Sequence, residues 1–374
     1  MRDFHWLHFS DLHLDPDANF NNAHARQQLL DFLEEEVSCG RLHCDYIFLT
    51  GDIAHKNNYD GVQEYIGKLF EKLNWSLDRY NNFFWASGNH DISRKSKLRK
   101  LVITKGLRES DNQSQTFEDW MRDPEFRELL VSKGMCDYIA WHKNILGRAP
   151  HCESNYPHTK HVFPNLNLIV LNTCLTSCDD EDEYKLHIIE SKLLNLFDGL
   201  NLSNPVFVIG HHGQEFFQES ERKRLGSLFD SGNVAIYLCG HSHELGYSEF
   251  KHTGWDLPQI TCGTITDGDA KPSFMHGSYK SKTNEVMIIP YSYGEEKGEW
   301  NWRIDDNLDR RLNGCTSIDL TNVKRIHPET RHSVSSVTGK NSENELPERN
   351  SNTNGIDWAT KFFASSSTKV GENV

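Results

Sequence analysis

The sequence has no apolar run that approaches the length of a membrane-spanning helix, and it has no signal peptide pattern. Its nine cysteines are an odd number without a paired spacing, which argues against a disulfide framework and predicts reduced thiols. No internal repeat is evident. These absences predict a cytoplasmic protein without a membrane partner.

Basic residues are also in the minority, with 40 Lys and Arg against 54 Asp and Glu and a net charge of −14. Non-specific binding to nucleic acid depends on basic surface that neutralises phosphates. The composition therefore disfavours a sequence-independent duplex nuclease, although a local basic face stays compatible with the net charge. The 374 residues suffice for one large α/β domain with additional segments.

Five short motifs carry the chemical information in this chain, and each lies where an apolar segment ends. The preceding segments are rich in β-branched and aromatic residues, which predicts buried strands at residues 4–9, 46–49, 83–86, 205–209 and 234–239. In chain order the motifs are Asp11-Leu12-His13, Gly51-Asp52, Gly88-Asn89-His90-Asp91, Gly210-His211-His212 and Gly240-His241-Ser242-His243.

Helical patterns lie between several of these strands, at residues 27–37, 62–73 and 186–196. Strands that alternate with helices predict a layered α/β architecture. Ligands of such folds bind beyond the carboxyl ends of the strands, so we expect the five motifs to meet at one edge.

The residue types in the motifs indicate a metal site. Asp, Asn and His suit borderline divalent ions such as Mn, Fe, Co, Ni and Zn, whereas an oxygen-only set would indicate Mg or Ca. The set suffices for two ions about 3.5–4 Å apart that share one carboxylate, and Asp52 is the natural bridge because it stands alone in its motif. A glycine before Asp52, Asn89, His211 and His241 lets the backbone approach the metal closely. Any one motif alone could be a turn, but their order and completeness favour a metal centre.

At these motifs the sequence resembles the calcineurin-like metallophosphoesterase superfamily, whose signature is Asp-X-His, Gly-Asp, Gly-Asn-His-Asp/Glu, His and Gly-His-X-His. The resemblance runs from about residue 4 to about residue 293. It implies an α/β fold, a four-layer αββα sandwich of two mixed sheets flanked by helices, with a dinuclear metal centre at the sheet edge.

The resemblance also implies roles for individual residues. The first metal would be held by Asp11, His13 and His243, and Asp52 would bridge to the second. The second metal would be held by Asn89, His211 and His241, with His212 as the alternative to His211. His90 matches the catalytic histidine of the family, and Asp91 would orient it. We also expect Asn89, His90 and Arg94 to bind the substrate.

Residues 92–160 form an insertion that leaves directly from the third motif, and we expect a helical cap. Its first part, residues 92–108, is basic and contains no acidic residue. The basic start would either bind a polyanionic substrate or pair with the acidic body of the protein. A helical pattern at residues 115–132 is interrupted by Pro124, which predicts two helices.

The remaining boundaries follow from composition. We expect a metallophosphoesterase domain at residues 1–325 and a polar tail at residues 326–374, which has too few apolar groups to order itself. Residues 356–364 form an apolar island in this tail. The island is either a segment that docks onto a protein partner or a loosely packed last helix.

Three functions follow from these observations. The first is a metal-dependent phosphoric ester hydrolase that acts on a phosphodiester or phosphomonoester, most plausibly of a nucleotide, by attack of a metal-bridging hydroxide. Its cofactors would be two divalent ions, with Mn favoured and Fe, Zn, Co or Ni accepted. The second is a nuclease on DNA or RNA with the same metal centre. The third is a non-catalytic scaffold with a partner-docking tail, which the intact catalytic histidine disfavours.

Overall fold

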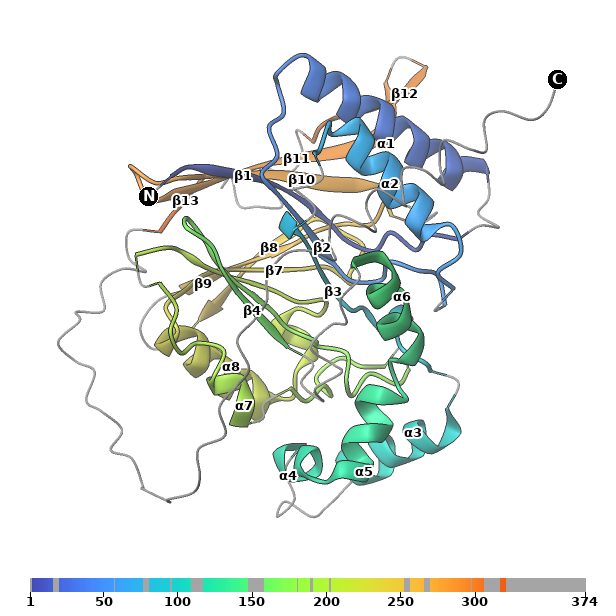
Figure 1. Ribbon diagram of the computed structural model, residues 1–374, viewed down its shortest axis with the longest axis vertical. Coiled ribbons are helices and arrows are strands. Elements are labelled where there is room, and N and C mark those ends of the chain that lie inside the picture. The colour runs from blue at the N-terminus through green and yellow to red at the C-terminus, as the bar shows by residue number, and fades with distance from the viewer. Residues whose placement is uncertain are drawn as a thin grey trace.

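Two mixed β-sheets stacked face to face form the centre of the molecule (Figure 1). The computed structural model describes residues 2–15, 20–56, 58–76, 81–94, 96–108, 117–146, 158–179, 181–188, 191–201, 203–251, 256–265, 270–296, 298–305 and 317–320. In the first sheet the parallel pairs lie at one end and the antiparallel pairs make up the rest, whereas in the second sheet the parallel pairs lie in the middle with an antiparallel pair at each end.

The first sheet contains seven strands. In spatial order they are β12 (Glu299–Ile304), β11 (Glu285–Glu296), β10 (Ser273–Lys280), β1 (Phe4–Phe9), β2 (Tyr46–Thr50) and β3 (Phe83–Ala86), with β13 (Ser317–Asp319) paired to β11. The second sheet has the order β4 (Thr159–Val162), β5 (Asn167–Val170), β6 (Val206–Ile209), β7 (Val234–Cys239), β9 (Asp256–Thr261) and β8 (Gly246–Lys251).

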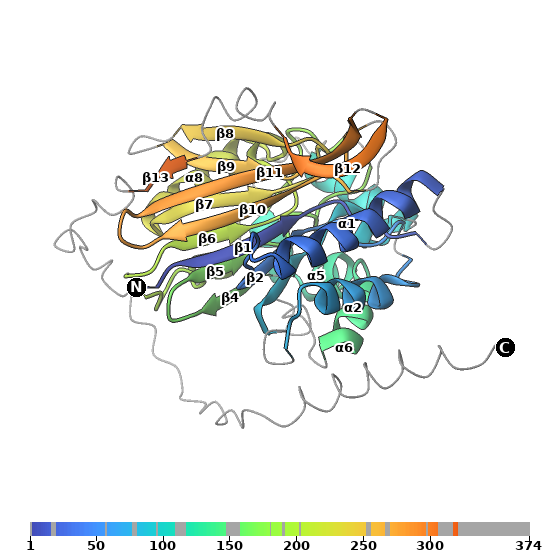
Figure 2. The same cartoon turned by 90° about the horizontal axis from the view of Figure 1, so that it is seen from above.

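Helices cover the outer face of each sheet, as Figures 1 and 2 show. On the first sheet lie α1 (Phe20–Ser38) and α2 (Val62–Lys72), and on the second lie α7 (Ser191–Leu194) and α8 (Glu219–Ser231). Between the sheets the alternate side chains of β1 pack on the facing strands, with the rings of Trp6 and Phe207 5.2 Å apart. The order of layers is therefore α, β, β, α, which confirms the predicted fold class.

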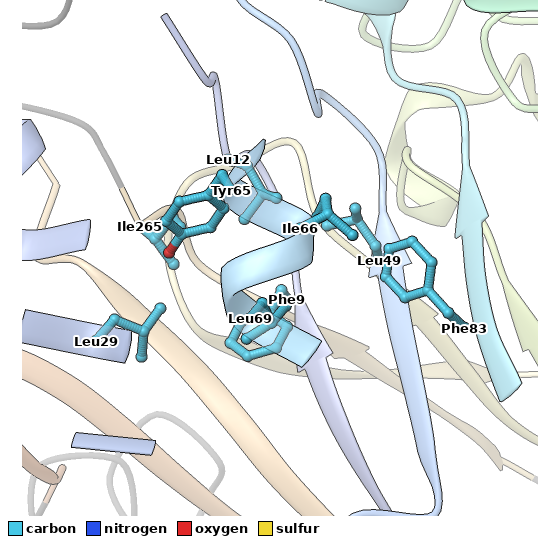
Figure 3. Close-up of a pocket in the computed structure, with 9 residues that line it drawn as sticks. All are labelled: Phe9, Leu12, Leu29, Leu49, Tyr65, Ile66, Leu69, Phe83 and Ile265. Carbon is cyan, nitrogen blue, oxygen red and sulfur yellow. The ribbon is translucent and has the colours of Figure 1, made fainter. Parts of the chain in front are cut away.

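The apolar packing beneath the first motif is nearly complete (Figure 3). A cavity of about 10 Å³, room for a single water, lies between α2, α1 and the ends of β1 and β2. Its wall is apolar and includes Leu12, from the first motif, and Leu49, from the end of β2. A cavity without polar partners stays dry, so the loop that carries Asp11 rests on hydrophobic contacts. Truncating one of these side chains to alanine costs roughly 2–5 kcal/mol.

The predicted strands and the helix predicted at residues 62–73 are confirmed to within one or two residues. The helix predicted at residues 27–37 is confirmed as α1, but it begins earlier, at Phe20. The predicted helix at residues 186–196 is wrong in its first part. Leu186 instead makes a parallel bridge to Phe217, because its N–H donates to the carbonyl of Phe216 and its carbonyl accepts from Gln218. The apolar spacing reports burial, and tertiary hydrogen bonds take the place of helical ones.

The described part of the insertion is helical, as expected. Its elements are α3 (Lys97–Leu101), a π-helix (Val102–Arg108), α4 (Phe117–Arg122), α5 (Pro124–Arg127), a π-helical turn (Glu128–Ser132) and α6 (Cys136–Leu146). Pro124 separates α4 from α5, as the sequence predicts. Asp123 caps the second helix, since its Oδ1 accepts hydrogen bonds from the N–H groups of Glu125 and Phe126 at 2.8 and 3.2 Å.

The basic start of the insertion binds the body of the protein. The buried guanidinium of Arg99 donates to the carbonyls of Ser177 and Leu175 at 2.6 and 2.7 Å. Arg108 pairs with Asp179 at 3.1 Å and with Asp182. Lys100 lies 3.4 Å from Asp179. These contacts match the alternative in which the basic segment pairs with the acidic run at residues 179–183.

The tail from residue 326, and with it the apolar island at residues 356–364, lies outside the described residues. The domain boundary at residue 325 therefore stays a prediction. Among the described helices, none combines the length and the apolar character that crossing a bilayer requires.

Candidate metal centre

The five motifs converge at the carboxyl ends of β1, β2, β3, β6 and β7. His13 and His243 are 230 residues apart in the chain, yet their Nε2 atoms are 3.1 Å apart. Nε2 of His211 lies 3.1 Å from Nδ1 of His241 and 3.4 Å from Oδ2 of Asp52. Two nitrogens that bind one cation at about 2.0–2.1 Å are separated by roughly 3.0–3.4 Å, so both pairs have the spacing of ligands that share an ion.

Several of these side chains stand on backbone of left-handed conformation. Asp11, His13, Asp52, His241 and His243 have φ values of 51°, 40°, 50°, 72° and 59°. Non-glycine residues rarely adopt this region, and each instance costs about 1–3 kcal/mol unless the surroundings hold it. Here the loops hold one another, since the N–H of Asp11 donates to Gly51 and that of His13 to Asp52, at 3.0 and 2.9 Å. The turn that brings alternate strand-end residues to one point is thus built into the backbone.

The glycines before the ligands allow close approach. Gly51 itself has a φ of 97°, and a Cβ on Gly88 would clash with the Asp52 carboxylate. A Cβ on Gly240 would clash with Oγ of Ser10 in the same way. Any larger residue at these positions would displace the neighbouring motif.

Asp11, His13 and His243 form the first donor set. Oδ2 of Asp11 is held by Oγ of Ser10 at 2.5 Å and by the N–H of His241 at 2.9 Å. Oδ1 is fully buried and faces Nε2 of His243 at 3.3 Å and Nε2 of His13 at 3.8 Å, but it makes no hydrogen bond to any residue that the structure describes. A buried carboxylate oxygen that faces two imidazole nitrogens fits a cation between them.

Asp52, Asn89, His211 and His241 form the second donor set. Oδ1 of Asn89 lies 3.1 Å from Nε2 of His211 and faces the Asp52 carboxylate, so it is surrounded by acceptors. Exchanging the amide oxygen and nitrogen would satisfy hydrogen bonding, whereas a cation would satisfy the orientation that the side chain has.

The Thr50 carbonyl orients His211. Nδ1 of His211 lies 2.7 Å from this oxygen, which fixes the proton on Nδ1 and leaves the lone pair of Nε2 for a cation. By contrast, Nδ1 of His212 lies 3.1 Å from Oγ1 of Thr173. The geometry therefore favours His211 over His212 as the ligand in the fourth motif.

The pKa values of Asp52 and His211 show that the second donor set favours positive charge. Burial alone would raise the pKa of Asp52, but His211 holds this pKa well below its ordinary value. Burial alone would lower the pKa of His211, but the Asp52 carboxylate raises it to about 9. A divalent cation supplies the same positive charge, so the donor chemistry of both sets fits two such ions.

His90 lies next to the first donor set. Its backbone N–H donates to Oδ1 of Asp52 at 2.7 Å, and its ring centroid is 4.8 Å from that of His13. Burial, with a smaller contribution from the nearby charge of Arg94, lowers the pKa of His90 to about 4, although the Asp52 carboxylate opposes this shift. The imidazole is therefore neutral at neutral pH, with one N–H to donate.

Asp91 does not take the position that we expect from the family. Its carboxylate accepts hydrogen bonds from the N–H of Gly88 at 2.8 Å and from Oη of Tyr59 at 3.1 Å, and weaker ones from the N–H groups of Ile53 and Ala54. Among the described residues it makes no hydrogen bond to the His90 ring. Asp91 ties the second and third motifs together, because its short side chain closes the turn that contains it.

His55 is the residue that sequence reasoning misses. Its only sequence signal is a place three residues after Asp52, and there it reads as a surface or supporting histidine. Its ring centroid lies 6.2 Å from that of His13 and 6.0 Å from that of His90. One nitrogen from each of the three rings lies within 4.8 Å of the others. His55 thus belongs to the rim of the site.

Comparison with known proteins agrees with this geometry. The profile of the family described as "Calcineurin-like phosphoesterase" matches residues 4–245. The uncharacterized metallophosphoesterase-like protein YydB of Bacillus subtilis (strain 168) is 26% identical over 306 residues, which cover 79% of this chain and 61% of that protein. The chain therefore spans less than two thirds of the length of this relative.

Two solved structures align with most of this chain at low identity and low TM-score. Vps29 of Chaetomium thermophilum is 10% identical with a TM-score of 0.34, covering 81% of this chain and 94% of its own. The purple acid phosphatase PPD1 from yellow lupin (Lupinus luteus) is 11% identical with a TM-score of 0.45, covering 84% of this chain and 56% of its own. The family profile spans more than half of the sequence and includes all five motifs, and this chain belongs to the calcineurin-like phosphoesterase family.

Proposed function

We propose that this protein is a dinuclear phosphoesterase that hydrolyses a phosphodiester or phosphomonoester, most plausibly of a nucleotide. The observation that carries the proposal is that two donor sets meet at one carboxylate, Asp52, with the His90 ring beside them. A scaffold has no need of a catalytic imidazole at this position, so a hydrolytic function accounts for more of the site.

The side chains divide the work as follows. Asp11, His13 and His243 would hold the first cation, Asn89, His211 and His241 the second, and Asp52 would bridge them. When bound, two divalent cations clamp phosphate oxygens, neutralise their charge and supply an activated water, and Mn, Fe, Zn, Co and Ni all suit these donors.

His90 and its neighbours bind the phosphate. A neutral His90 donates its ring N–H to a phosphate oxygen in the Michaelis complex. Protonation of the leaving oxygen by the same ring requires a rise of its pKa from about 4, which the negative charge of a bound phosphate favours. The positive charge of Arg94, which helps to lower the pKa of His90, would attract the substrate anion.

A small substrate is favoured over a long nucleic acid. The chain is acidic overall, with a net charge of −14. Of the basic residues at the start of the insertion, Arg99 and Arg108 donate to the loop at residues 174–182, so they do not form an open track for a polyanion. A nuclease with the same centre stays the alternative, but this pairing removes its main support.

The test is Mn²⁺-dependent hydrolysis by the wild type and by His90→Ala, measured side by side. The substrates are bis-p-nitrophenyl phosphate, p-nitrophenyl phosphate, cyclic nucleotides, and single- and double-stranded DNA. We expect turnover of the small esters or cyclic nucleotides, lowered roughly 10²–10⁴-fold in the variant with its metal retained. DNA cleavage that the variant loses would favour the nuclease, and no turnover with both metals bound would contradict the proposal.

A further inference from the structure

Tyr59, in the loop between β2 and α2, contacts the third motif with its hydroxyl and the insertion with its ring. The hydroxyl donates to Oδ1 of Asp91 at 3.1 Å. The ring stacks on that of Trp141 in α6, with the centroids 4.9 Å apart and the planes inclined by 21°. The proposed function gives Tyr59 no role, although this side chain joins two parts of the molecule that flank the metal centre.

On the side of the insertion, Tyr59 meets a buried aromatic cluster. Trp141 is 6% exposed, and its ring also lies 5.3 Å from that of Trp85 in β3, the strand beside α6 (Figure 1). Tyr138, three residues earlier in α6, is buried next to Trp141. Large aromatic rings in contact bury much apolar area and prefer few mutual orientations. The ring of Tyr59 is therefore held by α6, which itself rests on β3.

On the side of the third motif, the buried Asp91 carboxylate fixes the short turn that contains His90. Its Oδ2 accepts the N–H of Gly88 at 2.8 Å, which closes this turn. Among the described residues, the Tyr59 hydroxyl is the one side-chain donor to the carboxylate, and two N–H groups of the loop after β2 lie farther away, at 3.4 Å. Loss of the hydroxyl would leave a buried acceptor with weaker partners, so the turn would be held less firmly.

We propose that Tyr59 is a positioning residue, through which the packing of the insertion sets the place of His90 by way of Asp91. The inference rests on the proposed function, because His90 is needed at a fixed place only for hydrolysis. His90 directly precedes Asp91 in the turn, so a shift of Asp91 moves the His90 ring relative to the donor sets. A misplacement of about 1 Å at a catalytic group costs on the order of a hundredfold in rate. The insertion thus has a task at the site that requires no contact with the substrate.

The first experiment measures hydrogen–deuterium exchange at the amide of Gly88 in the Mn²⁺-loaded protein. Tyr59→Phe removes the hydroxyl and keeps the ring. The matched control is Tyr65→Phe, at another half-buried tyrosine, whose hydroxyl donates to the carbonyl of Arg26 at 3.5 Å. We expect exchange at Gly88 to be about tenfold faster or more in Tyr59→Phe and unchanged in the control, because a hydrogen bond to a charged group is lost. Unchanged exchange in Tyr59→Phe would overturn the inference.

A second pair of variants tests the contact with the insertion. Trp141→Leu removes the ring that stacks on Tyr59. Its control is Trp75→Leu, which removes an equally buried ring that stacks on Phe70, away from the third motif. Exchange at Gly88 should be faster in Trp141→Leu than in Trp75→Leu, and equal rates would contradict the proposal. If a leucine variant does not fold, the phenylalanine variants at the same two positions take its place, with the same order of rates expected.

Kinetics with the p-nitrophenyl esters determine whether Tyr59 acts through His90. We expect Tyr59→Phe to keep its Mn²⁺ and its KM and to lose about tenfold in kcat. In the His90→Ala background the same substitution should have no further effect, whereas a purely structural role would lower kcat by the same factor in both backgrounds. That equal loss, or a loss of Mn²⁺, would refute the inference. If the wild type hydrolyses no ester while exchange at Gly88 responds as described, the proposed function fails and the link between the insertion and the third motif stands.

Discussion

The Asp52 carboxylate lies 3.4 Å from the His211 imidazole at the centre of the fold, and both side chains are buried. This contact joins the end of β2, in the first sheet, to the end of β6, in the second. The second sheet therefore completes a site that the first sheet begins. Substitution of Asp52 or His211 tests whether the two sheets share one metal centre.

Replacing Asp52 with Asn should remove bound metal. The substitution keeps the shape of the side chain but removes the negative charge that would lie between two cations. We expect the metal content, measured by mass spectrometry after Mn²⁺ loading and desalting, to fall by at least one ion per chain. Asp45→Asn, which changes a carboxylate at the other end of β2, should retain the wild-type content. Full occupancy in Asp52→Asn would rule out the bridge.

Replacing His55 with Ala should weaken catalysis without loss of metal. The His55 ring lies beside those of His13 and His90, where it can contact a substrate phosphate. Loss of one hydrogen bond to a charged group predicts a fall in kcat/KM of about tenfold or more. His43→Ala, at an exposed histidine, serves as the control. Wild-type kinetics in His55→Ala would return His55 to the surface role that its sequence context suggests.

Replacing Arg99 with Met should loosen the insertion from the body. The buried guanidinium donates three hydrogen bonds to the carbonyls of Cys174, Leu175 and Ser177, and methionine would leave these acceptors unpaired. We expect the free energy of unfolding in urea to fall by about 2–4 kcal/mol.

The neighbouring residue provides the matched control for this change. Lys100 is half exposed and forms one ion pair with Asp179, so Lys100→Met should cost less than about 1 kcal/mol. Equal effects of the two substitutions would contradict the anchoring role of Arg99.

The free energy of unfolding should depend on pH through His276, which lies away from the metal centre. Burial, with a smaller contribution from nearby His5, lowers the pKa of His276 to about 4. Below pH 6.5 the unfolded chain binds a proton that the folded protein does not, so this contribution is complete above pH 6.5 and is lost as pH falls toward 4. In metal-free protein, His276→Gln should flatten the decline between pH 7 and 5. An unchanged pH dependence in this variant would show that His276 is charged in the fold.

The fold and most of the site are readable from the sequence for a definite reason. Strands β3, β6 and β7 are continuous apolar segments that end at glycine-containing motifs, and both signals are local. The Asp, Asn and His residues of these motifs indicate a metal site. The helix expected at residues 186–196 is wrong in its first part, because the same apolar spacing also suits an extended segment buried against α8 and the loop that precedes it.

The sequence by itself determined which side chains are present at the strand ends, their order along the chain and, through the family resemblance, the αββα layers that bring them together. Only the tertiary structure decided that Asp91 ties the second and third motifs together, that His55 joins the rim of the site, and that Arg99 and Arg108 bind the body of the protein. The physical reason is the distance along the chain over which each interaction acts. Burial and turn preferences act between neighbours in the chain, whereas the direction of a side chain and its hydrogen-bond partner depend on segments that meet only after folding.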